Sequence, residues 1–290
     1  MMWSSKKLWF YVLGCWSGYC PVGAAAADDG LAKNFVCQHP PYQPLLVSAS
    51  PLVIYIKNFL TPQERLHLYT ASQGKFSQSA VAAAGTAEDG DGGGSLASRH
   101  GARTSQSAYI PRDAVVHCIE ERAAVFQGYD VAREQLEPLQ LVKYGPGEQY
   151  RFHTDWLARD SVKAAHATAD NGGNRLSSFF VYVHLHENNT DTTTGGGTNF
   201  PLLHAPRDER WCAEQLVNCD EPWDNGVTFR PVPGHAVFWR NLHPEDGHGD
   251  YRTLHAGLPV STGEKIGMNI WTRQGPLNEE ARGPEYYPDV

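Results

Sequence analysis

Short apolar runs separated by glycine and proline make up most of the second half of the chain. The runs are rich in β-branched and aromatic residues, and no helical pattern alternates with them. Many short strands punctuated by turns favour a sandwich or jelly roll over a doubly wound sheet. We therefore predict a mainly β (α+β) fold with flanking helices, whose strands cover residues 139–144, 177–185, 227–229, 235–241, 251–258 and 265–272.

The first half of the chain has a more mixed pattern. The apolar residues of 52–59 follow the pattern of a strand, and Thr61 followed by Pro62 resembles a helix start with Thr61 as the N-cap. Residues 112–128 carry apolar side chains at helical spacing. Residues 82–98 are almost wholly alanine, glycine, serine and acidic residues, which are too poor in large apolar groups to order themselves, so we expect a mobile loop there.

These patterns divide the chain into four parts. Residues 1–27 form a leader, residues 28–138 an N-terminal arm and support region, residues 139–274 the β-rich core, and residues 275–290 a tail. We expect the helices of the support region to pack on the outside of the β-rich core.

The leader has the pattern of a targeting segment. Lys6 and Lys7 precede the uncharged stretch 8–27, which ends in small residues. A cleaved signal peptide is the favoured interpretation. The stretch is also long enough to cross a bilayer as a retained anchor, which is the one case in which we expect a membrane partner. The sequon at Asn188 agrees with a secretory route, to the endoplasmic reticulum lumen or outside the cell, and is a candidate glycosylation site.

Four cysteines lie after the leader. In an oxidising compartment, Cys212 could pair with Cys219 across a short loop, and Cys37 with Cys118 could tie the N-terminal arm to the domain. Free buried cysteines are the alternative, and other pairings of the four stay open at this point.

The charge of the chain bears on its partners. The 290 residues carry a formal net charge of −8, and lysine and arginine form no basic stripe. Because nucleic-acid binders neutralise phosphates with clustered basic side chains, we expect no nucleic-acid partner.

A candidate metal site comes from three residues. His153 and Asp155 lie two apart, and on an extended strand such residues point to the same side. An isolated pair of this kind is a weak signal, and His255 strengthens it. Two imidazoles and one carboxylate form a facial triad that leaves room on iron(II) for a bidentate 2-oxo acid and dioxygen. Zinc is the competing metal, but zinc cannot cycle through the oxidation states that an oxygenase requires.

Lys265 lies in a strand that otherwise looks buried. A lysine is rarely fully buried unless it is paired, so it is either a snorkelling surface residue or the partner of an anion. Beside the triad, a dicarboxylate cosubstrate is the natural anion. His184 and His186 also lie two apart, but no third ligand stands near them, and we interpret them as polar positions on a strand face.

Residues 139–274 resemble the catalytic domain of prolyl 4-hydroxylases. The match rests on three motifs in order: a tyrosine-to-aspartate motif at Tyr144–Asp155, a glycine-rich motif at Gly195–Pro201, and the distal His255 with Lys265 ten residues later. The resemblance implies a double-stranded β-helix, or jelly roll, which hydroxylates peptidyl proline to 4-hydroxyproline and yields succinate and carbon dioxide from 2-oxoglutarate. It implies iron(II), 2-oxoglutarate and dioxygen in the site, ascorbate as reductant, and a proline-rich peptide or protein as partner.

The resemblance also implies roles for individual residues. His153, Asp155 and His255 would hold the iron, and Lys265 with Tyr144 would hold the distal carboxylate of 2-oxoglutarate, with help from Thr198. Residues on the substrate side would be Arg103, Ser105, Tyr109 and Trp271.

One position departs from the family pattern, because Gly197 stands where the family commonly has glutamate. This change leaves the iron ligands intact and alters the local turn. The segments 156–176 and 212–231 look like insertions similar to those of fungal secreted members. Two rival functions remain open on the sequence alone: a related hydroxylase of a free amino acid or other small molecule, and a non-catalytic jelly roll that binds a protein or glycan.

Overall fold

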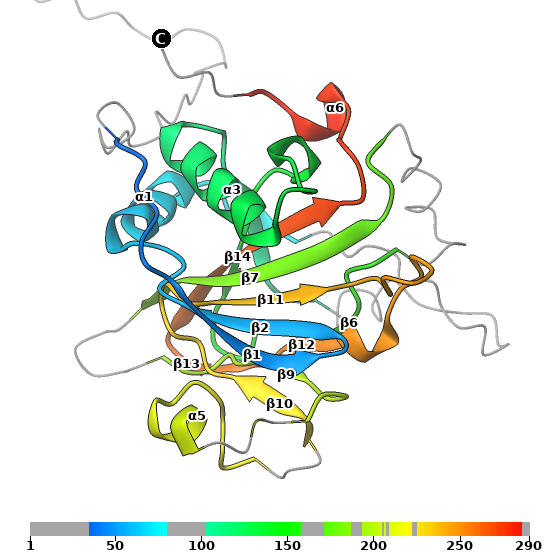
Figure 1. Ribbon diagram of the computed structural model, residues 1–290. Coiled ribbons are helices and arrows are strands. Elements are labelled where there is room, and N and C mark those ends of the chain that lie inside the picture. Colours follow the sequence, from blue (N-terminus) through cyan, green and yellow to red (C-terminus); the bar gives the residue numbers. More distant parts are fainter. Residues whose placement is uncertain are drawn as a thin grey trace, which may run out of the picture.

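Figure 1 shows the computed structural model of the chain. The structure describes residues 35–79, 103–157, 171–186, 193–204, 206, 209–221 and 225–285. The predicted leader 1–27, the predicted mobile loop 82–98 and Asn188 lie outside these ranges.

A large antiparallel sheet forms the frame of the molecule. Among the described residues its strands lie in the order β1-β2-β11-β7-β14-β5-β4-β3. Strands from before residue 139 therefore form both edges of the sheet. The strands are β1 Gln43–Ala49, β2 Leu52–Lys57, β11 Ala236–Arg240, β7 Arg175–His186, β14 Glu264–Arg273, β5 Gln140–Tyr144, β4 Gln106–Tyr109 and β3 Ser77–Gln78.

A smaller antiparallel sheet lies on the other side of this frame (Figure 1). Its order is β10-β9-β12-β6, and a separate ribbon pairs β13 with β8. Two antiparallel sheets that enclose a common core make a jelly roll, so the predicted mainly β fold is confirmed. The strands are β10 Val227–Phe229, β9 Thr198–Phe200, β12 His255–Gly257, β6 Tyr150–His153, β13 Val260–Thr262 and β8 Thr194–Gly195.

Helices cover the outer face of the large sheet. Helix α1 (Pro62–Ser72) begins at Thr61 with a capping box, because the Thr61 hydroxyl accepts from the Glu64 amide and the Glu64 carboxylate accepts from the Thr61 amide. Helix α3 (Ala114–Gln127) begins at Asp113, whose carboxylate caps two backbone amides. The remaining short helices are the 3-10 turns Arg133–Gln135 and Tyr251–Thr253, α5 Glu209–Ala213 and α6 Glu279–Arg282.

The alternation of side chains along β14 separates two cores. Ile266 and Ile270 belong to the apolar cluster beneath the helices. Successive side chains of a strand point to opposite faces, so Lys265, Asn269 and Trp271 face the small sheet. Strand β14 is therefore buried on both sides. One face packs in the apolar cluster beneath the helices, and the other face lines the space between the two sheets.

Two local predictions were wrong in detail. Residues 251–258 do not form one strand, because Asp250 caps a 3-10 turn through the Arg252 amide and strand β12 begins only at His255. Strand β6 ends at His153, and Asp155 lies in the bend that follows it. The side-chain alternation of a strand therefore does not place Asp155.

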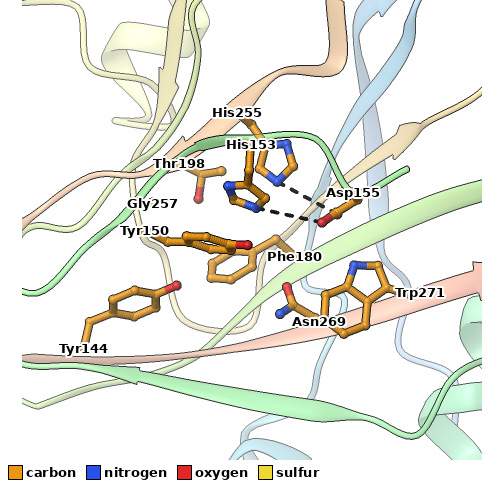
Figure 2. A pocket seen from close by; sticks show the side chains of 10 residues that line it. All are labelled: Tyr144, Tyr150, His153, Asp155, Phe180, Thr198, His255, Gly257, Asn269 and Trp271. Atoms are coloured by element: carbon orange, nitrogen blue, oxygen red, sulfur yellow. Dashed lines mark ion pairs between the residues drawn. The ribbon is translucent and has the colours of Figure 1, made fainter. Parts of the chain in front are cut away.

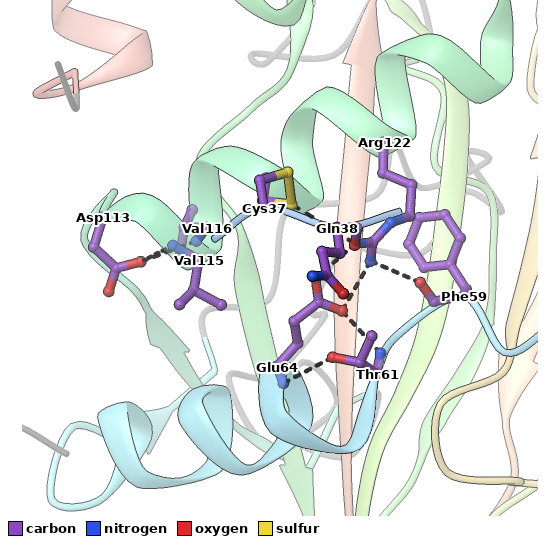
Figure 3. Close-up of a disulfide and its surroundings, with 10 residues drawn as sticks. Cys37, Gln38, Phe59, Thr61, Glu64, Asp113, Val115, Val116 and Arg122 are labelled. Carbon is purple, nitrogen blue, oxygen red and sulfur yellow. Dashed lines mark hydrogen bonds and ion pairs between the residues drawn. A yellow bond between two sulfur atoms is a disulfide. The ribbon is translucent and has the colours of Figure 1, made fainter. Parts of the chain in front are cut away.

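Both cysteine pairs favoured from the sequence are disulfide-bonded in the structure: Cys37 with Cys118, and Cys212 with Cys219. Figure 3 shows the first bond beside a buried ion pair in which Arg122 contacts Glu64 at 2.6 Å. Arg122 also donates to the carbonyls of Phe59 and Gln38, so this group ties the N-terminal arm to α1 and α3. Within the described ranges, no helix is both long enough and apolar enough to span a membrane.

Candidate active site

His153, Asp155 and His255 meet at one end of the space between the sheets. The register pairs His153 on β6 directly with His255 on β12. Nε2 of His153 lies 3.8 Å from Oδ1 of Asp155, and Nε2 of His255 lies 3.9 Å from Oδ2. One candidate ligand atom from each residue lies within 4.8 Å of the other two, and Figure 2 shows the three groups turned toward one another.

Each imidazole is fixed through its second nitrogen. Nδ1 of His153 lies 2.8 Å from the Arg151 carbonyl, and Nδ1 of His255 lies 2.9 Å from the Thr253 carbonyl. A carbonyl accepts only, so Nδ1 carries the proton and donates, and the lone pair of Nε2 faces the other two groups. This is the tautomer that a metal ligand needs.

Burial and neighbouring charges set the ionisation of these groups. Burial lowers the pKa of His153 to about 3, so its imidazole is neutral. Burial alone would raise the pKa of Asp155, but the two imidazoles and Arg175 outweigh it and lower the pKa, so the carboxylate stays ionised. Ser178 donates to Oδ2 of Asp155 at 2.7 Å and accepts from Asn241. The site therefore offers an anionic carboxylate and the neutral imidazole of His153 beside Nε2 of His255.

Aromatic rings hold both imidazoles in place. Tyr150 stacks on His153 with ring centroids 3.6 Å apart. Phe200 stacks on His255 at 5.3 Å, and Trp239 meets the same imidazole nearly edge-on at 4.7 Å. Because both rings are packed, their orientation does not depend on a bound ligand.

Lys265 lies deeper between the sheets and is fully buried. Its ammonium donates to the Gly196 carbonyl and lies 4.5 Å from the centre of the Tyr144 ring and 5.5 Å from that of Phe180. No carboxylate of the described residues forms an ion pair with it. Burial lowers the pKa of Lys265 to about 7. A buried ammonium that lacks a counter-charge is ready for an anionic ligand.

The glycine-rich turn before β9 wraps around this lysine. Gly196 has φ +68°, and a Cβ there would lie 3.0 Å from Val260 and 3.4 Å from the Lys265 side chain. At Gly197 a Cβ would lie 2.6 Å from Cγ2 of Thr228 and 3.1 Å from the Phe229 carbonyl oxygen. The small sheet therefore leaves no room at position 197 for the glutamate common in the family.

The remaining predicted residues lie at different distances from the pocket. Thr198 lines it and accepts from the Tyr182 hydroxyl at 2.9 Å. Trp271 lines it as well, and the Arg175 guanidinium covers its ring at 3.6 Å. The pocket is lined by Tyr144, Tyr150, His153, Asp155, Phe180, Thr198, His255, Gly257, Asn269 and Trp271.

Arg103, Ser105 and Tyr109 stand behind this lining. The Arg103 guanidinium lies 4.7 Å above the Tyr150 ring and donates to the Ser105 hydroxyl at 3.0 Å. Ser105 is hydrogen-bonded to Tyr144. Burial raises the pKa of Tyr144 to about 12. Tyr109 is 59% exposed and lies on β4.

Several lining residues were missed from the sequence. Tyr150 lies within the predicted motif but was given no role, although its place between Tyr144 and His153 is a usable signal. Asn269 shares a strand face with Lys265 and Trp271, so simple alternation along the predicted strand would have found it. Phe180 comes from β7, as does Arg175, which contacts the lining residue Trp271, and nothing in their local sequence points to the pocket.

Comparison with known proteins decides the family. The chain is 30% identical to probable prolyl 4-hydroxylase 4 of Arabidopsis thaliana over 227 residues, which cover 78% of this chain and 68% of that relative. The chain belongs to the prolyl 4-hydroxylase family. Residues 139–273 match the 2OG-Fe(II) oxygenase superfamily. The family predicted from the motifs is thus confirmed, and the chain is a 2-oxoglutarate-dependent dioxygenase of the prolyl 4-hydroxylase type.

Other prolyl 4-hydroxylases resemble the chain over shorter or more divergent stretches. Identity to the rat prolyl 4-hydroxylase subunit alpha-1 is 32% over 184 residues, which cover 63% of this chain and 28% of that subunit. Among solved structures, the viral collagen prolyl hydroxylase vCPH of Paramecium bursaria Chlorella virus-1 aligns with a TM-score of 0.49 and 22% identity, over 82% of this chain and 98% of the viral one.

Proposed function

We propose that the chain hydroxylates proline residues in peptides or proteins, using iron(II), 2-oxoglutarate and dioxygen. One observation carries the proposal: a two-histidine, one-carboxylate triad and a buried lysine without a counter-charge lie between the same two sheets. The triad suits the metal, and the lysine suits the far carboxylate of the cosubstrate. The family relationship supplies proline as the target.

The donor set fits iron(II). His153 and His255 would bind it through Nε2, and Asp155 through a carboxylate oxygen, leaving positions free for a 2-oxo acid and dioxygen. Iron(II) held by these residues would supply the activation of dioxygen, with one oxygen atom used to oxidise 2-oxoglutarate to succinate and carbon dioxide and the other inserted into a C–H bond of the substrate. The protein keeps the His153 imidazole neutral and Asp155 anionic, so neither of these two ligands has to lose a proton when the metal binds.

The surroundings of Lys265 fit the distal carboxylate of 2-oxoglutarate. An anion there would neutralise the buried ammonium and hold it in the charged form. The Tyr144 hydroxyl lies near Gly257, where an added Cβ would be 3.5 Å from it, and can donate a second hydrogen bond to the same carboxylate. Thr198 lines the pocket and accepts a hydrogen bond from the Tyr182 hydroxyl, so the Thr198 hydroxyl can still donate its own hydrogen.

The aromatic and polar wall around the triad fits a peptide. Trp271 lines the pocket and offers it a flat ring for a proline, because Arg175 covers the indole from one side and is held there by Glu137 at 2.7 and 2.9 Å. Proline-rich segments hold an extended conformation without internal hydrogen bonds, so capturing them costs little entropy. We include ascorbate as the reductant that restores iron(II) after uncoupled turnover.

We further propose that the protein works in the secretory pathway. Two disulfides among its four described cysteines support this, because such bonds persist in oxidising compartments. Expression in a secretory host should give a product whose mobility shifts on deglycosylation, and Asn188→Gln should remove the shift. A product that stays reduced and cytosolic when the full chain is expressed would contradict the proposal.

A peptide panel tests the enzymatic proposal. The protein is incubated with iron(II), ascorbate, 2-oxoglutarate and either a Ser-Pro repeat peptide, a collagen-like Pro-Pro-Gly peptide or free proline at equal ring concentration. Mass spectrometry should find hydroxyproline in peptides at a rate well above that for free proline. Faster turnover of free proline or of another small molecule would replace the peptidyl function with the small-molecule alternative.

A further inference from the structure

One row of polar side chains runs across the large sheet from the pocket to the surface. The strand register pairs Asn269 of β14 with Gln140 of β5, and Gln140 with Tyr109 of β4. Gln140 is buried, with 6% of its surface exposed, and Tyr109 is 59% exposed. The row thus begins in the active-site pocket, where Asn269 is part of the lining, and ends in solvent.

Hydrogen bonds fix the direction of every amide in this row. Arg103 can only donate, and its guanidinium donates to Oε1 of Gln140 at 3.4 Å. Nδ2 of Asn269 donates to the same oxygen at 3.1 Å, and Nε2 of Gln140 donates to the Tyr109 hydroxyl at 2.8 Å. Because its nitrogen is committed to Gln140, Asn269 presents its oxygen elsewhere, and Figure 2 shows that oxygen turned toward Tyr150 and the triad.

A hydrogen-bond donor faces the same pocket two residues further along β14. Trp271 has only 7% of its surface exposed, and its Nε1 has no hydrogen-bond partner among the described residues. The indole is clamped, because Arg175 lies 3.6 Å above its ring and is itself held by Glu137. A buried N–H without an acceptor is costly, so this group points to a ligand that supplies one.

The two groups match the backbone of an extended peptide. Residues two apart on one strand face are separated by about 7 Å, and two residues of a polyproline II chain rise about 6 Å. An acceptor at Asn269 and a donor at Trp271 can therefore bind an N–H and a C=O of the same peptide. A proline has no backbone N–H, so the N–H must belong to a neighbouring residue that is not proline.

Resting on the proposed function, we propose that Asn269 is a specificity-determining residue that accepts the backbone N–H of a non-proline residue next to the target proline. The substrate class is then peptides in which proline alternates with other residues, in preference to uninterrupted polyproline. Gln140 is the positioning residue, since it holds the Asn269 oxygen toward the substrate.

The first test uses the unaltered protein and three peptides. One is a Ser-Pro repeat, and the others carry a single N-methylserine directly before or directly after the target proline. Loss of one such hydrogen bond lowers kcat/KM by about tenfold. We expect that loss from at least one of the two methylated peptides, and a similar deficit for polyproline of equal length. Equal turnover of all these peptides overturns the proposal.

The second test uses variants. Asn269→Leu removes the acceptor at similar volume, and it should bring the Ser-Pro peptide and its sensitive N-methylated form to about equal kcat/KM while the Michaelis constant for 2-oxoglutarate changes less than about twofold. Gln140→Met should weaken the preference in the same direction. Thr272→Val, a neighbour on the opposite strand face, is the matched control and should keep the full preference.

The outcomes separate this inference from the proposed function. If Asn269→Leu slows all peptides equally, or raises the Michaelis constant for 2-oxoglutarate instead, the specificity role is wrong and hydroxylation of peptides stands. If the unaltered protein forms no hydroxyproline in any peptide, the proposed function and the inference both fail.

Discussion

The ammonium of Lys265 lies 4.5 Å from the centre of the Tyr144 ring, where the register of β14 and β5 sets the two residues directly opposite each other. The pair closes the inner end of the space between the sheets, away from solvent. A charge at such a depth stabilises the protein only when an anion accompanies it. We therefore expect Lys265 to bind an anionic ligand, and we expect its buried charge to destabilise the fold when no ligand is bound.

Lys265→Ala should raise the Michaelis constant for 2-oxoglutarate at least about tenfold, because a charge-assisted hydrogen bond contributes roughly 1.5 to 3 kcal/mol. Lys265→Arg should not restore it fully, since the planar guanidinium is longer than the compact ammonium. Initial rates measured at varied concentrations of 2-oxoglutarate give the Michaelis constants of both variants. An unchanged Michaelis constant in the alanine variant would place the lysine outside the cosubstrate site.

The stability of the cosubstrate-free protein should depend on pH through Lys265. The pKa of Lys265 is about 7 in the folded protein, and the ordinary value for a lysine, which applies to the unfolded chain, is 10.5. The cost of burying the charge is thus fully present below pH 7 and is relieved as the pH rises toward 10.5, because the unfolded chain then binds more protons. Lys265→Met should raise the Tm more at about pH 6 than at about pH 9. An equal gain at both pH values would contradict the assigned pKa.

Removal of the Glu64 carboxylate should destabilise the fold far from the active site. Glu64 and Arg122 are fully buried partners, with Nη2 and Oε1 2.6 Å apart (Figure 3). Glu64→Ala leaves the guanidinium buried and unpaired, which costs about 3 to 5 kcal/mol of unfolding free energy. Urea unfolding measures the loss, and Glu64→Leu combined with Arg122→Met should recover much of it. A single variant as stable as the parent would contradict this account of the pair.

Gly197→Glu restores the residue common in the family but should harm this chain. The added Cβ would meet Cγ2 of Thr228 at 2.6 Å and the Phe229 carbonyl oxygen at 3.1 Å, so β9 and β10 must separate. Overpacking of this kind costs about 1 to 3 kcal/mol. Thermal unfolding should show a lower Tm, partly recovered by Thr228→Gly in the same chain. A Tm at or above that of the parent would show that the strands separate easily.

The sequence predicted the framework well where a physical signal was local. The capping pattern at Thr61, the strand from 227 to 229 and the helix ending near Gly128 all depend on neighbouring residues, and the structure has them. Asp155 shows the limit of such reasoning, because it reaches the triad from a bend rather than by strand alternation.

Contacts between segments far apart in the sequence could not be predicted from local sequence patterns. Arg175 covers Trp271 and pairs with Glu137, three residues from separate elements that only the sheet register brings together. The clash that requires Gly197 depends on Thr228, which lies on the next strand of the small sheet. No sequence pattern gives the pairing of β9 with β10. The sequence therefore shows that Gly197 replaces the glutamate common in the family, but it does not explain why.

Each of the variants His153→Ala, Asp155→Ala and His255→Ala should lose iron(II) binding and turnover, because each removes one of three protein ligands. The jelly-roll core does not depend on the ion, so circular dichroism should remain that of the parent protein. His248→Ala, a half-exposed loop histidine, serves as the matched control and should keep full activity.

The most direct test of the central claim is the amount of succinate and of peptidyl hydroxyproline formed together from a Ser-Pro repeat peptide, with iron(II), ascorbate and 2-oxoglutarate supplied. The unaltered protein and His248→Ala should form the two products in nearly equal amounts, and the three triad variants should form neither. Succinate without hydroxyproline in the unaltered protein, or near-normal hydroxyproline in His153→Ala, would contradict the account.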